Sequence, residues 1–202
     1  MWDLFINISY YDLVVKISNP NLIFRNLFKT MGFELEMERT LVIIKPDGMK
    51  LGITPEVIRR FHSAGLRVSK IKKVLASSGL LSKHYPEEDE YLISIGKKNT
   101  SDADKEKARE IGLMVVRNLQ NYLQESKVTV MIVEGRDGIS VVRKIVGNTD
   151  PSKAEKGTIR GDFGKDSIQK ANAEHRAVRN LIHASGNKEE AEKEIELWFG
   201  KI

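Results

Sequence analysis

The first strong strand signal in the chain is Thr40-Leu41-Val42-Ile43-Ile44, a short run of apolar and β-branched residues. Such a run, without polar alternation, predicts a strand that is buried on both faces. The polar turn Lys45-Pro46-Asp47-Gly48 follows it. A helix is predicted next, because Thr54 suits the N-cap, Pro55 the first helical position, and Gly65 the left-handed position after the last turn.

The rest of the chain is predicted from the same kinds of signal. Strands are predicted at residues 66–75, 128–133 and 179–184. Helices are predicted as short pieces within 79–96, at 108–123, 139–146 and 168–177, and from Asn187 to about Phe199, where Asn187 and Glu190 resemble a capping box. Polar or glycine-rich loops are predicted at 97–107 and 147–167. This order favours the split βαβ plan, an α+β fold with helices packed on an antiparallel sheet.

Composition sets further bounds on function. The chain has 202 residues, 41% hydrophobic and 30% charged, which is ordinary for a globular protein. It has no cysteine, which excludes a disulfide scaffold, a thiol nucleophile and a thiolate metal site. The net charge of +5 comes without a block of like charges that would indicate a nucleic-acid-binding tail. No apolar run approaches the ~18 residues of a membrane span, and no signal peptide is recognised, so we expect a cytoplasmic protein.

The first 36 residues differ from the remainder. They are rich in aromatic residues but show no sustained period of a helix or a strand. We therefore interpret residues 1–36 as an N-terminal extension and residues 37–202 as the functional domain. The extension is either a genuine addition or an upstream stretch included by a misplaced start.

The last predicted helix carries a carboxylate within its apolar stripe. Glu194 lies between Ala191 and Trp198, and a bare carboxylate is costly to bury. His183 ends the preceding strand, so a strand-turn-helix return can bring Glu194 to its imidazole ring. A glutamate that holds one ring nitrogen as N–H leaves the lone pair of the other free to attack. The alternative is a surface glutamate and a structural histidine.

Three cationic side chains suggest phosphate chemistry. Lys45 closes the first strand, Arg143 is predicted on or near the inner face of its helix, and Arg160 lies in the glycine-rich stretch 157–163. Flanking glycines allow close approach of a ligand, and arginine can chelate phosphate oxygens. The alternative is a set of solvated surface cations. The other three histidines are scattered without metal-ligand spacing, so we assign no role to His62, His84 or His175 and predict no protein metal site.

Four ordered blocks of the chain resemble one known family. The blocks are residues 38–48, 143–150 and 157–163, and the pair Asn180-Leu181-Ile182-His183-Ala184-Ser185 and Glu194-Ile195-Glu196-Leu197-Trp198-Phe199. They resemble the nucleoside diphosphate kinases. The resemblance implies a ferredoxin-like fold with a four-stranded antiparallel sheet, covered by helices and carrying insertions. It also implies a ping-pong transfer of the terminal phosphoryl group from a nucleoside triphosphate to a diphosphate, through a phosphohistidine on His183.

The resemblance implies a role for each matched residue. His183 matches the nucleophile, Glu194 the carboxylate that orients it, and Lys45 the lysine that contacts the ribose and the transferring phosphate. The remaining matches are the phosphate-binding Arg143, Thr149 and Arg160, the ribose-binding Asn180, and the supporting Tyr85 and Ser185. Mg²⁺ is expected to arrive with the nucleotide and to be held mainly by its phosphates. A homo-oligomer, either a tetramer or a hexamer, is also expected.

The chain departs from the family in several places. The residue that stacks on the base is not evident, and Tyr91 and Ile93 are the candidates. Insertions are expected between Tyr85 and Val128 and between Phe163 and Asn180. Lys156 stands where proline is common, and Ala184 where glycine is more frequent.

The competing function is a nucleic-acid-binding module, since ferredoxin-like sheets also bind RNA. That function would need aromatic and basic residues interleaved on the central strands. The predicted strands at 41–44 and 128–133 are aliphatic, so no specific nucleic acid is predicted as a partner.

Overall fold

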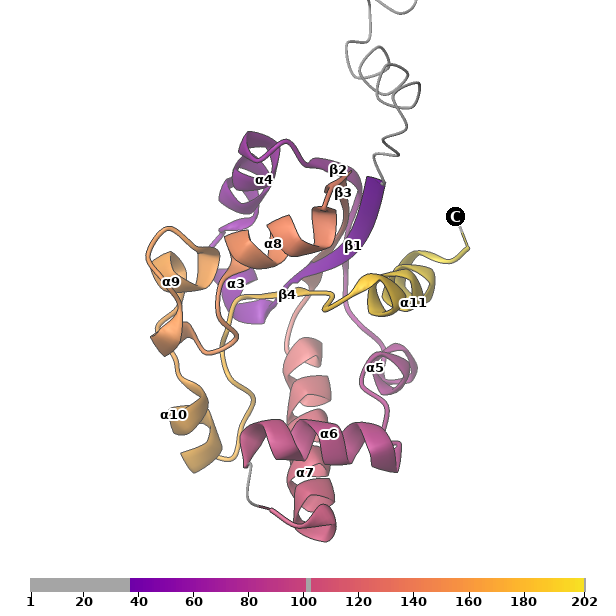
Figure 1. Ribbon diagram of the computed structural model, residues 1–202, viewed down its shortest axis with the longest axis vertical. Helices are drawn as coiled ribbons and strands as arrows, with labels where there is room; N and C mark the ends of the chain where they lie inside the picture. Colours follow the sequence, from indigo (N-terminus) through magenta and orange to yellow (C-terminus); the bar gives the residue numbers. More distant parts are fainter. Residues whose placement is uncertain (1–36, 101–102, 202) are drawn as a thin grey trace, which may run out of the picture. The chain divides into compact units, whose positions relative to one another are not determined.

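The computed structural model of the chain describes residues 37–100 and 103–201, so the expected extension at 1–36 lies outside the described residues. Four strands of the described part form one sheet in the order β2-β3-β1-β4 (Figure 1). They are β1 (Met37–Ile44), β2 (Arg67–Val74), β3 (Val128–Arg136) and β4 (Ile182–Ala184). Every neighbouring pair is antiparallel. The predicted four-stranded antiparallel sheet of a ferredoxin-like, split βαβ fold is confirmed.

The two faces of the sheet carry separate hydrophobic cores, because successive strand residues point to opposite sides. Leu41 and Ile43 lie in a core shared with α5 (Ser78–His84), α6 (Asp89–Asn99), α7 (Lys105–Gln124) and α11 (Lys188–Phe199). Val42 and Ile44 lie in a second core, shared with α4 (Thr54–Ser63), α8 (Gly138–Val146) and α9 (Ile159–Phe163). Three short elements complete the chain order. The helix α3 (Pro46–Lys50) follows β1, the 3₁₀ turn η1 (Pro151–Lys153) lies between α8 and α9, and α10 (Ile168–Ala173) lies between α9 and β4. β1 is thus buried on both faces, as its sequence predicts.

Helices α6 and α7 cross closely at the bottom of Figure 1. Two glycines make the approach possible. A Cβ atom on Gly96 would lie 1.8 Å from the carbonyl oxygen of Ala108, and one on Gly112 would lie 2.0 Å from that of Leu92. No side chain fits at either position, so the glycines set how closely the two helices pack. This helix pair lies between Tyr85 and Val128, where an insertion is expected from the sequence.

Some predicted helix and loop boundaries are wrong. The predicted loop at 97–107 is shorter, since α6 continues to Asn99 and α7 begins at Lys105. The predicted loop at 147–167 contains η1 and α9, and the hydroxyl of Thr158 caps α9 by accepting the N–H of Gly161. The many glycines of that segment favoured the prediction of a loop, so Thr158 was not recognised as an N-cap. Thr54 is the first residue of α4 rather than its N-cap, whereas Gly65 takes the predicted left-handed conformation, with φ +77°.

The segment before β4 also differs from its prediction. The helix predicted at 168–177 ends at Ala173, and His175 has a φ of +50°, which is incompatible with a continuing helix. The strand predicted at 179–184 covers only 182–184. Leu181 has a φ of +69°, so the backbone cannot be extended at that residue.

Candidate active site

His183 lies on β4 opposite Ile43 of β1. The period of the strand places it on the side of the sheet that carries α11, and Glu194 lies on that helix. The Nε2 atom of His183 is 2.9 Å from Oε1 and 3.0 Å from Oε2 of Glu194. The contact predicted from the strand-turn-helix return is therefore present, and it leaves Nδ1 of His183 free of the carboxylate.

Glu194 is anchored from its other side by Ser185. The hydroxyl of Ser185 donates to Oε2 of Glu194 at 2.6 Å and accepts the backbone N–H of Leu41 at 3.2 Å. Burial acts to raise the pKa of Glu194, but its electrostatic interaction and hydrogen bond with His183 outweigh burial, so the net pKa is lowered. Glu194 is thus an ionised carboxylate that accepts a proton-bearing Nε2 atom. Ser185, for which the resemblance implies a supporting role, thus contacts the carboxylate of this pair.

A second histidine lies beside the pair. His84 ends α5, its side chain is fully buried, and its ring centroid lies 5.1 Å from that of His183 in an edge-on arrangement. Its Nδ1 atom is 3.4 Å from Oε1 of Glu194 and accepts the indole N–H of Trp198 at 3.3 Å. Burial, and then the nearby His183, lower the pKa of His84 to about 3, so its ring is neutral.

The sequence analysis assigned no role to His84, and it did not locate the contact of this residue with Glu194. The three groups His84, His183 and Glu194 lie close enough to one another to hold a metal ion. The indole N–H of Trp198 occupies Nδ1 of His84, however, and Glu194 already accepts from His183 and Ser185. The donor set fits a hydrogen-bonded cluster better than a metal centre.

Two buried cations border this cluster. Lys45 follows β1 directly and donates from Nζ to Oδ1 of Asn180 at 2.8 Å. Burial, and then the charge of Arg160, lower the pKa of Lys45 to about 7, against an opposing effect of Asp47. Burial, and then the charge of Arg143, lower the pKa of Arg160 to about 10. Both cations are therefore held in an environment that favours an anionic ligand.

Arg160 is also bound to the backbone. Its guanidinium donates to the carbonyl oxygens of Asn180 at 3.1 Å, Gly147 at 2.8 Å and Ile182 at 2.6 Å. Because guanidinium has five N–H donors, two remain for a ligand. The arginine therefore both holds the backbone before His183 and faces the cavity.

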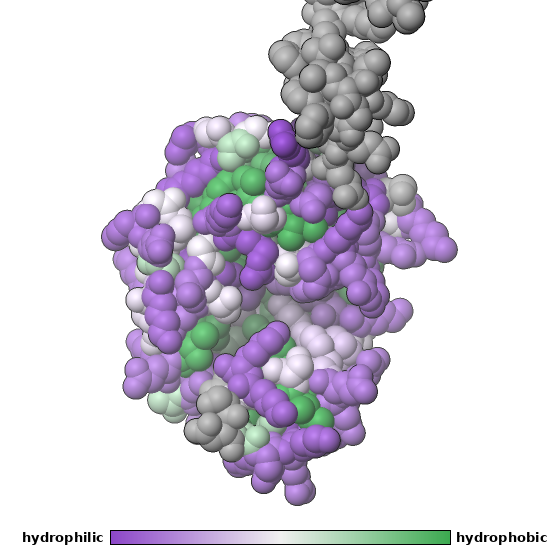
Figure 2. All heavy atoms as spheres, in the orientation of Figure 1, coloured by the Kyte–Doolittle hydropathy of each residue, from purple (hydrophilic) through white to green (hydrophobic). Residues whose placement is uncertain are grey.

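These side chains line a cavity of about 620 Å³. Figure 2 shows a hollow on this face, bordered by hydrophilic residues and with apolar residues on its walls. The residues predicted for the site that line the cavity are Lys45, Tyr85, Arg143, Thr149, Arg160, Asn180 and His183, whereas Ser185 and Glu194 lie behind His183. Arg143 was predicted on or near the inner face of its helix, but it is exposed at the border of the cavity.

The cavity has an apolar part that sequence reasoning did not locate. Ile95 of α6 and Val115 and Leu119 of α7 line it. Neither candidate for the base-stacking residue is among the lining residues: Tyr91 packs on the core of α5, α6, α7 and α11 instead. The wall comes from α6 and α7, whose residues lie far along the chain from the strands that carry the rest of the site.

Taken together, the geometry places the imidazole of His183, with Glu194 bound to its Nε2 atom, beside a cavity that has cationic side chains and an aliphatic wall. Cations arranged around a nucleophile can neutralise the charge that a transferring phosphoryl group carries. The aliphatic wall suits a flat apolar group beyond those charges. The arrangement fits a phosphorylated ligand with such a group.

Comparison with known proteins gives a consistent result. The chain matches a family model described as Nucleoside diphosphate kinase over residues 38–93 and 99–202. A relative with that name from Pyrobaculum aerophilum is 38% identical over 176 residues, covering 82% of this chain and 96% of the relative. One from Pyrococcus abyssi is 41% identical over 166 residues, covering 82% and 86%. The interruption at 94–98 falls within α6.

Solved structures agree with the sequence matches. An NDP kinase from Pyrobaculum aerophilum superposes with a TM-score of 0.75 at 38% identity, covering 81% of this chain and 96% of that one. A nucleoside-diphosphate kinase from Borrelia burgdorferi, described as a transition state mimic with bound vanadate and ADP, gives a TM-score of 0.67 at 34% identity. It covers 81% of this chain and 87% of that one.

Proposed function

Because the chain belongs to the nucleoside diphosphate kinase family, we propose that His183 is its nucleophile and that the phosphoryl group is carried on Nδ1. The enzyme transfers the terminal phosphoryl group of a nucleoside triphosphate to a nucleoside diphosphate. The observation that carries the residue assignment is the contact between Nε2 of His183 and Glu194. It keeps the proton on Nε2, so the lone pair of Nδ1 can bond to phosphorus while the bond to the bridging oxygen breaks.

The proposed binding residues surround the nucleophile. Lys45, Arg143 and Arg160 supply positive charge to the phosphates, and Thr149 lies among them on the cavity wall. Asn180, held by Lys45 and by the carbonyl oxygen of Thr149, is proposed to contact the ribose. Phosphoryl transfer depends mainly on positioning and on charge neutralisation, which these groups can provide. Tyr85 and Ser185 are proposed to support the catalytic pair.

Mg²⁺ is the proposed divalent cation. Glu190 is the one acidic residue among those that line the cavity, so side-chain carboxylates of the lining would supply at most one ligand to the ion. Mg²⁺ is usually bound by substrate phosphates together with water, which fits a cationic cavity of this kind. When bound, the ion would neutralise part of the triphosphate charge. The groups described above then need only position the nucleotide.

Domain organisation, assembly and location complete the proposal. Residues 37–202 are proposed as the catalytic domain and residues 1–36 as an extension. A homo-oligomer, a tetramer or a hexamer, is proposed from the family resemblance, and the exposed Ile71 on the outer strand β2 is an apolar side chain that such a contact could cover. Within the described residues no helix has the length and apolar content to cross a membrane. A cytoplasmic location is proposed because a chain without cysteine suits a reducing compartment.

The orienting role of Glu194 can be tested by Glu194→Gln. The amide keeps the size of the side chain but removes the charge that holds Nε2 of His183 as a donor. We expect phosphoenzyme formation to slow by about 10²-fold, the usual loss for one electrostatic contributor. Single-turnover labelling from a terminally labelled nucleoside triphosphate measures it. Glu196→Gln, on the exposed side of the same helix, is the matched control. Equal rates for both variants would refute the role.

The pKa of Lys45 predicts a pH dependence. Its pKa is lowered to about 7, so the protonated form that binds phosphate is lost as the pH rises through that value. We expect kcat/KM, which reports on groups of the free enzyme, to fall between about pH 7 and about pH 9. Lys45→Gln has no proton to lose, so it should be slower at pH 7 but lack this fall. A fall of the same size in Lys45→Gln would assign it to another group.

Weak discrimination among nucleotide bases is also expected. The wall of Ile95, Val115 and Leu119 offers no hydrogen-bonding group to a base. Lys98 and Asn172, which also line the cavity, are exposed, so water can replace any bond that they make. A pocket that hydrogen-bonds its substrate discriminates by roughly 10⁴–10⁵-fold. Values of kcat/KM for A, G, C, U and T nucleotides should differ far less, and any pair that differs by that factor would contradict the prediction.

A further inference from the structure

Leu181 has an unusual backbone conformation close to the proposed nucleophile. It lies two residues before His183, is buried, and has a φ of +69°, in a region that bulky residues rarely adopt. The N–H of Ile182 bonds to the carbonyl oxygen of Asn180 at 2.8 Å, so Leu181 is the centre of a three-residue turn. Such a turn is strained and persists only where its surroundings hold it.

The turn after β1 stabilises this conformation of Leu181 through hydrogen bonds. The N–H of Leu181 donates to Oδ2 of Asp47 at 3.1 Å, and its carbonyl oxygen accepts the N–H of Lys45 at 2.8 Å. The other carboxylate oxygen, Oδ1, accepts the backbone N–H of Gly48 at 2.9 Å and the hydroxyl of Tyr122. Both peptide groups of the strained residue are therefore bound to the segment 45–47.

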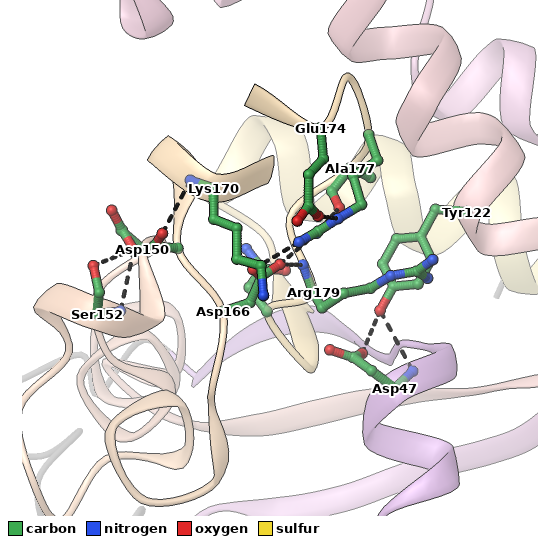
Figure 3. Close-up of polar contacts among 12 residues, drawn as sticks. Asp47, Tyr122, Asp150, Ser152, Asp166, Lys170, Glu174, Ala177 and Arg179 are labelled. Atoms are coloured by element: carbon green, nitrogen blue, oxygen red, sulfur yellow. Dashed lines mark hydrogen bonds and ion pairs between the residues drawn. The ribbon is translucent and has the colours of Figure 1, made fainter. Parts of the chain in front are cut away.

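The position of Asp47 is in turn supported from α7. Figure 3 shows the hydroxyl of Tyr122 directed at Asp47 and the side chain of Arg179 lying against the tyrosine ring. Burial, and then the charge of Asp47, raise the pKa of Tyr122, so the hydroxyl remains a donor. The guanidinium of Arg179 lies 4.1 Å from the ring centroid and makes two bonds of 2.7 Å to Glu125. Through these contacts the position of the Asp47 carboxylate depends on the 20-residue helix α7.

We propose that Asp47 is a positioning residue, which holds the strained turn at Leu181 and thereby places Asn180 and His183 at the cavity. Asn180 and His183 lie on either side of the turn, so a change at Leu181 displaces both. The proposal rests on the proposed function only in taking these two residues as parts of the nucleotide site. Asp47 itself is not among the residues that line the cavity, so its effect is exerted through the backbone.

The substitution Asp47→Asn tests this role without changing the size of the side chain. In the native structure each carboxylate oxygen faces a backbone donor, Gly48 on one side and Leu181 on the other. In either orientation of the amide, its NH₂ group faces the backbone N–H of Gly48 or of Leu181. A backbone N–H can only donate, so no bond forms there. The variant therefore loses at least one bond and gains a repulsive contact.

Amide hydrogen exchange measures directly how strongly the Leu181 N–H is bound. In Asp47→Asn we expect the Leu181 amide to exchange at least about tenfold faster, while the amides of β1 and β3 keep their protection. The matched control is Asp166→Asn, since Asp166 accepts the N–H of Arg179 in the same segment (Figure 3). That variant should release the Arg179 amide and leave Leu181 protected. An unchanged Leu181 amide in Asp47→Asn would overturn the proposal.

A kinetic double-mutant cycle links the turn to the chemistry. We expect Asp47→Asn to slow phosphoenzyme formation by roughly 10²-fold, the cost of a small misplacement of reacting groups. In the Leu181→Gly background the same change should cost less than about threefold, because glycine takes a positive φ without strain. An equal loss in both backgrounds would overturn the proposal.

The two readouts separate this proposal from the function itself. If Leu181→Gly does not fold, the exchange measurement on Asp47→Asn still decides the case. The exchange measurement requires neither nucleotide nor a reactive His183. An unchanged exchange rate of the Leu181 amide in Asp47→Asn would therefore overturn the positioning role alone. Failure of the native enzyme to take label on His183 would overturn the proposed nucleophile instead.

Discussion

Replacing His183 with alanine is expected to abolish both the phosphoenzyme and turnover. In the proposed mechanism the imidazole supplies the nitrogen that bonds to phosphorus. The other groups that contact Glu194, which are Ser185 and His84, do not line the cavity. Loss of an essential nucleophile costs roughly 10⁴-fold or more in kcat. Incubation of the native enzyme with a terminally labelled nucleoside triphosphate and Mg²⁺ should leave label that is labile in acid and stable in base, and His183→Ala should leave none.

Two exposed histidines serve as controls for this experiment. His62 on α4 and His175 after α10 lie at the surface, so His62→Ala and His175→Ala should label as the native enzyme does. His84 is unsuitable as a control because it contacts Glu194. His84→Ala is nevertheless expected to retain label, since the nucleophile itself is unchanged. Full turnover in His183→Ala, or label found on Ser185, would disprove the mechanism.

Replacing Arg160 with alanine should reduce both activity and stability. The guanidinium binds the carbonyl oxygens of Asn180, Gly147 and Ile182, and these lose their donor together. The Asn180 carbonyl keeps its bond from the N–H of Ile182. A buried polar group left without a partner costs about 1–3 kcal/mol, so we expect the other two carbonyls to lower the free energy of unfolding by about 3 kcal/mol. The loss of positive charge at the phosphates should lower kcat/KM by about 10³-fold.

The two effects can be separated experimentally. Urea unfolding gives the stability, and kcat/KM is measured at a temperature where the variant remains folded. Arg160→Lys keeps the charge but not the forked geometry, so it should recover part of the activity and little of the stability. Activity lost without any loss of stability would show that the carbonyl contacts contribute nothing to the fold.

Much of the fold follows from local patterns. Residues 40–44 are apolar without alternation, so they specify a strand buried on both faces, and β1 has the two cores that this requires. Gly65 and Asn187 mark helix ends through conformational and capping preferences that involve only their neighbours. Where those signals conflicted, as with Thr158 among glycines, the prediction of a loop was wrong.

The central contact of the site was only partly predictable. His183 and Glu194 are joined by one strand end, one turn and two turns of helix, so periodicity allows the contact but leaves a surface glutamate as the alternative; the structure shows the contact. Their roles, and those of the cationic residues, come from the family resemblance and stay predictions until tested.

Other parts of the site depend on how distant elements pack. His84 reaches Glu194 because α5 and α11 share one face of the sheet, and its bond to Trp198 spans 114 residues. The aliphatic wall exists because Gly96 and Gly112 let α6 and α7 cross closely. The positive φ of Leu181 is held by Asp47, which is 134 residues away. Local propensity encodes strands, helices and caps, whereas strain, burial and long-range partners are settled only when the packed elements meet, because each depends on atoms from several segments at once.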